Sequence, residues 1–249
     1  MYDKMKLNTK VIIPALIFVG ILSVGLISYG QIQQTNAQST GFPGLDKIPG
    51  LDIFNKFVGE HNSNNNGPSN SNADYLDIDK AVVGTDAKKV QAVLQAHGHI
   101  PKDGSGGAFG YGILTTKDIS AVMVSTTHKG VLDSKEQKNK NDPVWHNHYV
   151  SLGEDTKNCG SNPAVTSITY QSPGQVLVSK DKAIMSNLPA KFTGTNALDN
   201  KPLTLNPGTN VKNVVSFKLL PVFESEAPGA KLLAVCVTDI HPADKVIKN

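Results

Sequence analysis

Short runs of β-forming residues alternate with turn segments along the chain from residue 75 to residue 249. Segments such as PKDGSGG (101–107) and ESEAPGA (224–230) are rich in residues that favour turns. Closely spaced short strands are typical of all-β sandwiches and barrels. We therefore expect one all-β domain, a β-sandwich or a barrel-like domain, over 75–249. The clearest expected strands are 110–115, 119–127, 144–152, 165–170, 175–178, 213–223 and 231–238.

Residues 86–97 fit two kinds of secondary structure. Val90, Val93 and Leu94 follow a helical stripe, but Val90 and Leu94 also belong to an alternating apolar pattern typical of a strand. Because the rest of the domain is β-rich, we favour a strand here. The domain then contains at most one short helix.

A long apolar run precedes the domain. Residues 11–30, VIIPALIFVGILSVGLISYG, carry no charge and would span about 30 Å as a helix, the thickness of a bilayer core. Lys4, Lys6 and Lys10 precede it, so residues 1–10 are expected in the cytoplasm and the remainder outside. The run is either a transmembrane anchor or the core of a signal peptide cleaved after 35–37. We expect a cell-membrane protein with an extracellular domain, or a secreted one if cleavage occurs.

Residues 31–74 have the composition of a linker. Gly and Pro are frequent in its first half, and 61–74 (HNSNNNGPSNSNAD) are nearly all Asn, Ser, Gly and Pro. Such a segment cannot bury enough apolar surface to offset its loss of conformational entropy. We expect a flexible tether between the membrane and the domain.

The chain contains two cysteines, Cys159 and Cys236. In the oxidising compartment expected for an exported domain, a disulfide is the usual outcome for such a pair. Two buried free thiols are the alternative.

Charge composition argues against nucleic acid as a partner. The formal net charge is only +3, and no arginine occurs in the sequence. Arginine forks and a basic stripe normally recognise phosphates and bases. The expected contacts are with the membrane, through 11–30, and with proteins at the cell surface, while the oligomeric state stays open.

Residues 142–155, DPVWHNHYVSLGED, contain the chemistry that most suggests a site. In a strand, alternate residues share a face, so His146 and His148 would lie on one side and Trp145, Asn147 and Tyr149 on the other. The two histidines would be about 6.5–7 Å apart along the strand. Metal–nitrogen bonds of about 2.0–2.1 Å would allow their imidazoles to converge on one ion.

Other histidines could complete such a site. His97 and His99 form a second His-x-His unit around Gly98, and His128 directly follows an expected strand. Imidazole suits zinc and copper alike, so the pattern does not select the metal.

The last part of the chain offers a second copper hypothesis. In CVTDIHPADKV (236–246), Cys236 and His241 have a spacing similar to the Cys-to-His loop of the cupredoxins, which are exported β-sandwiches. The resemblance implies a copper–thiolate site, which would exclude a disulfide at Cys236. The sequence departs from the family pattern because no methionine follows His241.

These features favour an exported, membrane-tethered β-domain that binds zinc or copper through His-x-His strand residues, with a metal-binding or cell-surface role. The alternatives are a structural or adhesive β-sandwich without metal and a degenerate cupredoxin-like copper protein. An enzyme is less favoured and no catalytic residue is assigned: the Gly-x-Ser-x-Gly motif is absent, and the glycine-rich 103–112 lacks dinucleotide and P-loop spacings.

Overall fold

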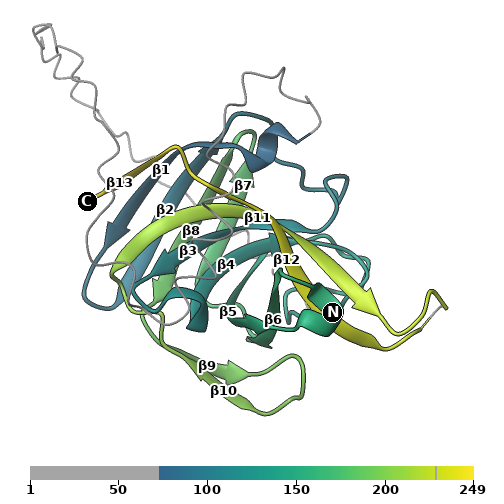
Figure 1. Cartoon of the computed structure of the whole chain (residues 1–249). Helices are drawn as coiled ribbons and strands as arrows, with labels where there is room; N and C mark the ends of the chain where they lie inside the picture. The colour runs from purple at the N-terminus through teal and green to yellow at the C-terminus, as the bar shows by residue number, and fades with distance from the viewer. Residues whose placement is uncertain (1–72, 228) are drawn as a thin grey trace, which may run out of the picture. The chain divides into compact units, whose positions relative to one another are not determined.

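The computed structural model describes residues 73–227 and 229–249 (Figure 1). The predicted cytoplasmic segment, the apolar run 11–30 and nearly all of the linker 31–74 lie outside the described residues. Within the part of the chain that is described, no helix has the length and apolar character needed to cross a membrane.

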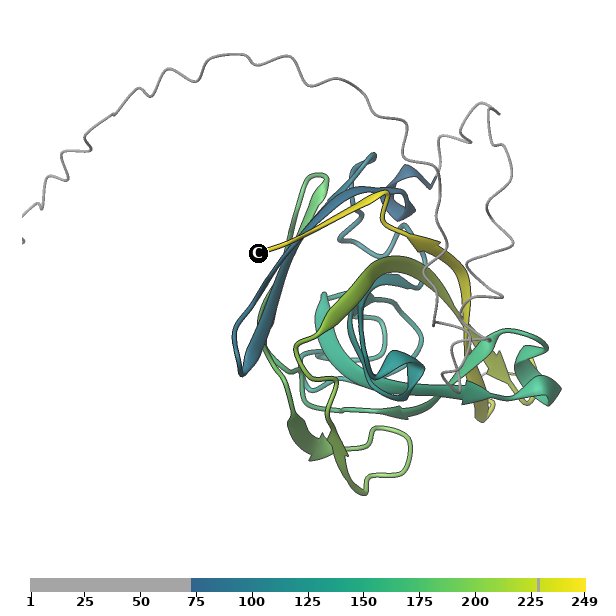
Figure 2. The same cartoon turned by 60° about the vertical axis from the view of Figure 1, so that its left-hand side comes forward.

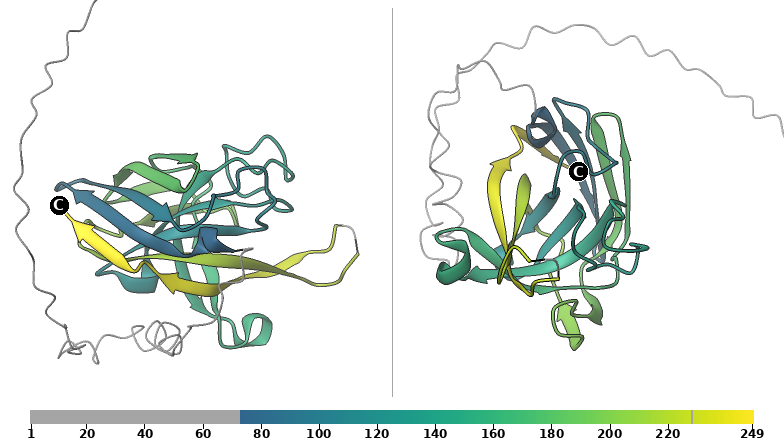
Figure 3. Two further views of the ribbon diagram at one scale, coloured as in Figure 1. Left: turned by 90° about the horizontal axis from the view of Figure 1, so that it is seen from above. Right: turned by 90° about the vertical axis from the view of Figure 1, so that its right-hand side faces the viewer.

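Six antiparallel strands form a closed barrel in the order β11-β12-β6-β5-β4-β3. The strands are β3 (Phe109–Thr115), β4 (Val122–Thr127), β5 (His146–Glu154), β6 (Pro163–Ile168), β11 (Val211–Phe223) and β12 (Leu232–Pro242). The sequence predicted part or all of each one. β11 and β12 form a long hairpin whose tip projects away from the rest of the domain (Figure 3, left).

A second sheet of five strands has the order β13-β1-β2-β8-β7, with β13 and β1 parallel and the other pairs antiparallel. Its members are β1 (Ile78–Thr85), β2 (Lys89–Ala96), β7 (Gln175–Ser179), β8 (Lys182–Pro189) and β13 (Lys245–Lys248). The smaller elements are β9 (Phe192–Thr195), β10 (Pro202–Leu205), α2 (Thr156–Cys159), η2 (Asp74–Leu76) and η3 (Asp118–Ser120).

The described residues therefore form a β-rich domain with a closed barrel and one short α-helix, in agreement with the coarse expectation. Residues 86–97 contain strand β2, as favoured from the sequence. The sequence did not distinguish a sandwich from a barrel, and it did not identify β1, β8, β9, β10 or β13.

Alternation along the barrel strands produces two separate cores. On β3, Phe109, Tyr111 and Ile113 point out of the barrel and pack with apolar residues of the five-stranded sheet. On β4, the apolar side chains of Val122 and Val124 point into the barrel. Because successive strand residues face opposite sides, one strand serves both cores. The five-stranded sheet covers one side of the barrel (Figure 2).

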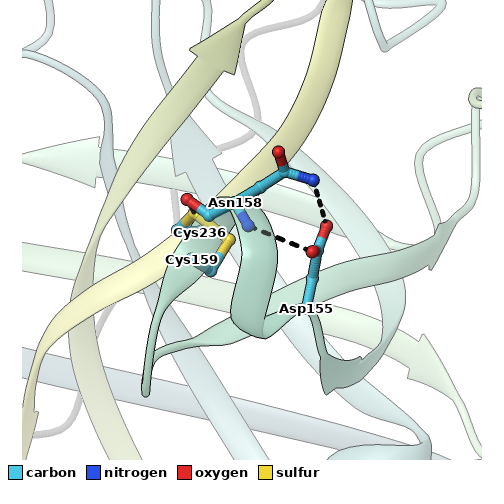
Figure 4. The surroundings of a disulfide bond; sticks show 4 residues. All are labelled: Asp155, Asn158, Cys159 and Cys236. Carbon is cyan, nitrogen blue, oxygen red and sulfur yellow. Dashed lines mark hydrogen bonds between the residues drawn. A yellow bond between two sulfur atoms is a disulfide. The ribbon is translucent and has the colours of Figure 1, made fainter.

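Cys159 and Cys236 form a disulfide bond with a Cα–Cα distance of 5.4 Å, as predicted from the sequence (Figure 4). It joins α2 to β12. At the start of α2, the Asp155 carboxylate accepts hydrogen bonds from the Asn158 backbone N–H at 3.2 Å and from its amide Nδ2 at 2.7 Å. On the chain-entropy account, a link across 77 residues stabilises the fold by about 4–5 kcal/mol.

Candidate metal centre

Four side chains converge where β4 ends and β5 begins: His128, Asp133, His146 and His148. The Oδ1 atom of Asp133 lies 3.2 Å from Nε2 of His128, 3.5 Å from Nε2 of His146 and 3.6 Å from Nε2 of His148. Three imidazole nitrogens thus surround one carboxylate oxygen.

Strand β5 supplies two of the four groups in the way the alternation predicted. His146 and His148 share the face that points into the barrel, and both are fully buried. Trp145 and Tyr149 point the opposite way and pack in the core against the five-stranded sheet. Asn147 shares their face, where its Nδ2 donates a hydrogen bond to the Pro173 carbonyl at 2.8 Å.

Antiparallel pairing of β4 with β5 brings in the third imidazole. Thr126 pairs with His146 in the register of the two strands. His128 lies two residues beyond Thr126, so it reaches the same end of the barrel. Its ring centroid is 5.0 Å from that of His146, and the rings of His146 and His148 are 4.7 Å apart, each pair nearly perpendicular.

The loop between the strands, residues 128–145, carries Asp133. Gln137 organises this loop from within, since it is buried. Its Oε1 accepts the backbone N–H of Asp133 at 3.1 Å, while its Nε2 donates to the carbonyls of Val131 at 3.2 Å and Asp142 at 3.3 Å. Gln137 therefore sets the position of the carboxylate without contributing a ligand atom.

Hydrogen bonds on the far side of the imidazoles determine where their lone pairs point. Nδ1 of His146 lies 2.7 Å from the Val144 carbonyl, and Nδ1 of His148 lies 2.6 Å from the Thr169 carbonyl. A carbonyl only accepts, so each Nδ1 carries the proton and donates it. In the neutral tautomer, the lone pair on each Nε2 then points towards Asp133. This is the arrangement that fixes histidine ligands around a metal.

Three of the four inner atoms lack hydrogen-bond partners. Nε2 of His128, Nε2 of His148 and Oδ1 of Asp133 are buried and make no hydrogen bond. Buried polar atoms without a partner are costly, and such cases often mark a missing ion. A cation placed among these atoms would satisfy all three.

The protonation states suit a cation. Burial lowers the pKa of His146, against the opposing effect of Asp133, so its neutral form is favoured. Burial alone would raise the pKa of Asp133, but hydrogen bonds from the three imidazoles, when their Nε2 atoms carry protons, would hold that pKa well below its ordinary value. An ionised carboxylate beside a neutral imidazole is the state that metal binding requires.

The three distances from Asp133 Oδ1 to the imidazole nitrogens can be compared with the ligand spacing of a tetrahedral site. With bonds of about 2.0–2.1 Å, two ligands of a tetrahedral ion lie about 3.3–3.4 Å apart. In a square plane with the same bonds, neighbours are about 2.8–3.0 Å apart and opposite ligands about 4.0–4.2 Å. The observed distances from Asp133 to the three nitrogens, 3.2, 3.5 and 3.6 Å, agree with the tetrahedron.

The other histidines proposed from the sequence lie elsewhere. His97 and His99 follow the end of β2 and are exposed. His97 belongs to a separate exposed group with Asp77 and Asp244, in which its Nε2 is 3.9 Å from an Asp244 carboxylate oxygen. The structure thus brings together His128, His146 and His148, and leaves His97 and His99 outside their cluster.

The copper–thiolate hypothesis finds no thiolate. Cys236 is bonded to Cys159, so its sulfur is not available as the anionic ligand that the pairing with His241 needs. The structure instead contains the disulfide that was expected for this cysteine pair.

Sequence reasoning missed Asp133 and Gln137. Gln137 lies in KEQKNKND (135–142), and Asp133 lies just before it. The composition of this segment indicates only a loop. The available signal was the position of Asp133 five residues after His128, on the connection between the two strands that supply the imidazoles. An acidic residue on such a connection was a candidate fourth ligand.

The fold and the converging side chains together define a disulfide-linked β-barrel domain with a candidate metal centre. Comparison of the chain with known protein families, curated proteins and solved structures found no match. Function is therefore inferred from the geometry of the site.

Proposed function

We propose that the domain binds a divalent transition metal ion through His128, His146, His148 and Asp133. The observation that carries this proposal is the convergence of three imidazole nitrogens on one carboxylate oxygen in a buried site. Zinc is the favoured ion, because it accepts nitrogen and oxygen ligands in a tetrahedron and has no preference for a square plane. Copper(II) prefers tetragonal geometry and ranks second.

The ligand set favours a metal that is retained. Three imidazoles and a carboxylate complete four-coordination with protein atoms alone, the pattern of structural zinc sites, whereas catalytic sites keep a position for water. Bound metal would join the end of β4, the start of β5 and the loop 128–145. We assign the domain a metal-binding role, in which the ion stabilises the fold and does not take part in substrate turnover.

We also propose that the domain works outside the membrane. The apolar run 11–30 with its preceding lysines supports export, with a membrane anchor or a cleaved signal. The Cys159–Cys236 disulfide is what an oxidising exterior would produce. A membrane anchor would keep the bound metal at the cell surface. Cleavage of a signal would release the metal with the secreted chain.

Metal content and titration test the function directly. The purified full-length chain is stripped with chelator, dialysed, and titrated with zinc and with copper(II) by calorimetry. We expect one zinc per chain. Copper(II) usually binds nitrogen ligands more tightly than zinc does, and we expect that difference in affinity to be smaller at this site. The double variant His97→Ala/His99→Ala is the control and should bind like the unchanged chain. Absence of binding by the unchanged, folded chain would reject the proposal in favour of a structural barrel.

A further inference from the structure

The barrel interior contains a cavity of about 80 Å³. Its walls come from all six barrel strands, and apolar side chains such as Val124, Val150 and Val237 make up nearly all of them. The polar side chains in the lining are those of Thr126 and His148. The surface of the cavity is therefore apolar throughout, and the polar atoms of Thr126 and His148 do not face it.

One part of the cavity wall adjoins the candidate metal centre. His148 is at once a member of the converging group and part of the cavity wall. Its Nε2 is buried without a hydrogen bond. Thr126, the other polar member, has its hydroxyl 3.3 Å from Nε2 of His146. Val131, in the loop 128–145, also lines the cavity. A molecule in the cavity would touch the residues that surround the ion.

The cavity wall also extends to the surface. Leu198, in the turn between β9 and β10, lines it and is 49% exposed. Part of the cavity wall therefore lies at the surface of the domain.

We infer that the barrel interior is a binding pocket for a small, uncharged, apolar molecule, held next to the metal ligand His148. Pockets for small ligands are lined mostly by apolar side chains, as this one is. An apolar cavity of about 150 Å³ stays dry and accepts benzene or xenon, so a space about half as large suits a molecule of roughly three or four heavy atoms. A charged molecule is excluded because the walls offer no countercharge. This pocket goes beyond the proposed metal site and does not require it.

Xenon is a suitable probe because it is apolar and compact. Methyl groups of valine and leucine are labelled in the full-length chain, and their NMR signals are followed under increasing xenon pressure. Methyls of Val124, Val150 and Val237 should shift and saturate, while those of Val83, buried in the other core, should stay fixed. Acetate, of similar size but charged, should leave all of them unchanged. Shifts confined to other core methyls, or none at all, would overturn the pocket.

A filling substitution supplies the matched variant. Val124→Phe places a ring in the cavity and should abolish the xenon shifts at Val150 and Val237. Val93→Phe makes the same change on an exposed position of β2 and should leave them intact. If Val124→Phe does not fold, Val150→Ala enlarges the cavity instead and should increase xenon uptake. Unchanged uptake in the folded variant would contradict the assignment.

Repeating the titration with and without zinc separates the two proposals. Xenon should shift the valine methyls in both states. Xenon binding without any zinc binding would reject only the metal proposal. Zinc binding with no xenon response would reject only the pocket.

Discussion

Two segments of this chain have the same His-x-His pattern, and the fold treats them in opposite ways. His146 and His148 lie within a strand whose inner face is buried in the barrel, so alternation points both imidazoles to one place. His97 and His99 lie just beyond the end of β2, where the alternation stops, and both are exposed. The spacing of two histidines thus acquires meaning only when a strand continues through both.

The middle residue of each pair reinforces the contrast. Asn147 is buried and hydrogen-bonded to the Pro173 carbonyl, which holds β5 in place behind the site. At Gly98 a Cβ atom would lie 2.7 Å from Cβ of Asp74, so glycine there permits close approach of η2. Gly98 also donates its N–H to the Asp74 carbonyl at 3.1 Å. The glycine therefore serves packing against η2.

The largest expected effect is the loss of metal after removal of one imidazole. His146→Ala and His148→Ala should each weaken zinc binding by at least about 100-fold, about 2.7 kcal/mol, because each deletes one of four converging donors. His99→Ala, the same substitution in the exposed pair, should leave the affinity unchanged. Competition with a chelating dye measures all three. Equal zinc affinities in all three variants would show that the buried pair contributes no more to zinc binding than the exposed pair does.

A smaller loss is expected from Gln137→Ala. The variant keeps all four ligands but removes the hydrogen bonds that position Asp133 and the loop 128–145. Substitution of residues that orient metal ligands typically lowers affinity about 10- to 100-fold. Lys138→Ala, an exposed neighbour, is the control. If zinc binds Gln137→Ala as tightly as the unchanged chain, the loop does not depend on this residue.

The stability of the metal-free domain should fall as pH decreases below about 6.5. Because the pKa of His146 is lowered in the fold, the unfolded chain takes up a proton there that the folded chain does not. One such group contributes a slope of at most about 1.4 kcal/mol per pH unit, between the unfolded and the folded pKa. Urea unfolding from pH 7.5 to 5.5 should therefore show a shallower slope in His146→Ala. A steeper slope in that variant would contradict the lowered pKa.

The remaining effect concerns the middle of the exposed pair. Gly98→Ala should destabilise the domain by about 1–2 kcal/mol, since the added methyl overlaps Asp74. Zinc affinity should not change. Thermal unfolding and zinc titration of one preparation test both statements, with Gly84→Ala as the control because its added Cβ would meet only the flexible side chain of Gln91. A change in zinc affinity would connect this region to the site.

Much of the candidate site could be predicted because it depends on local periodicity. His146 and His148 were placed together by alternation within one strand, and His128 by its position directly after another. Asp133 could not be predicted in this way, because a loop has no repeat that fixes the direction of a side chain. Its position depends on Gln137 and on the path of the loop between two paired strands.

By itself, the sequence determined the β-rich character of the domain, the faces of β5 and a cysteine pair suited to a disulfide, since each follows from local pattern or composition. Tertiary structure alone decided that six strands close into a barrel and that an aspartate joins the three imidazoles. It also decided which His-x-His pair is buried. Closure and convergence depend on pairings between residues far apart in the chain, such as β11 with β3. Local periodicity carries no information about which distant strands meet, and the site exists only after they do.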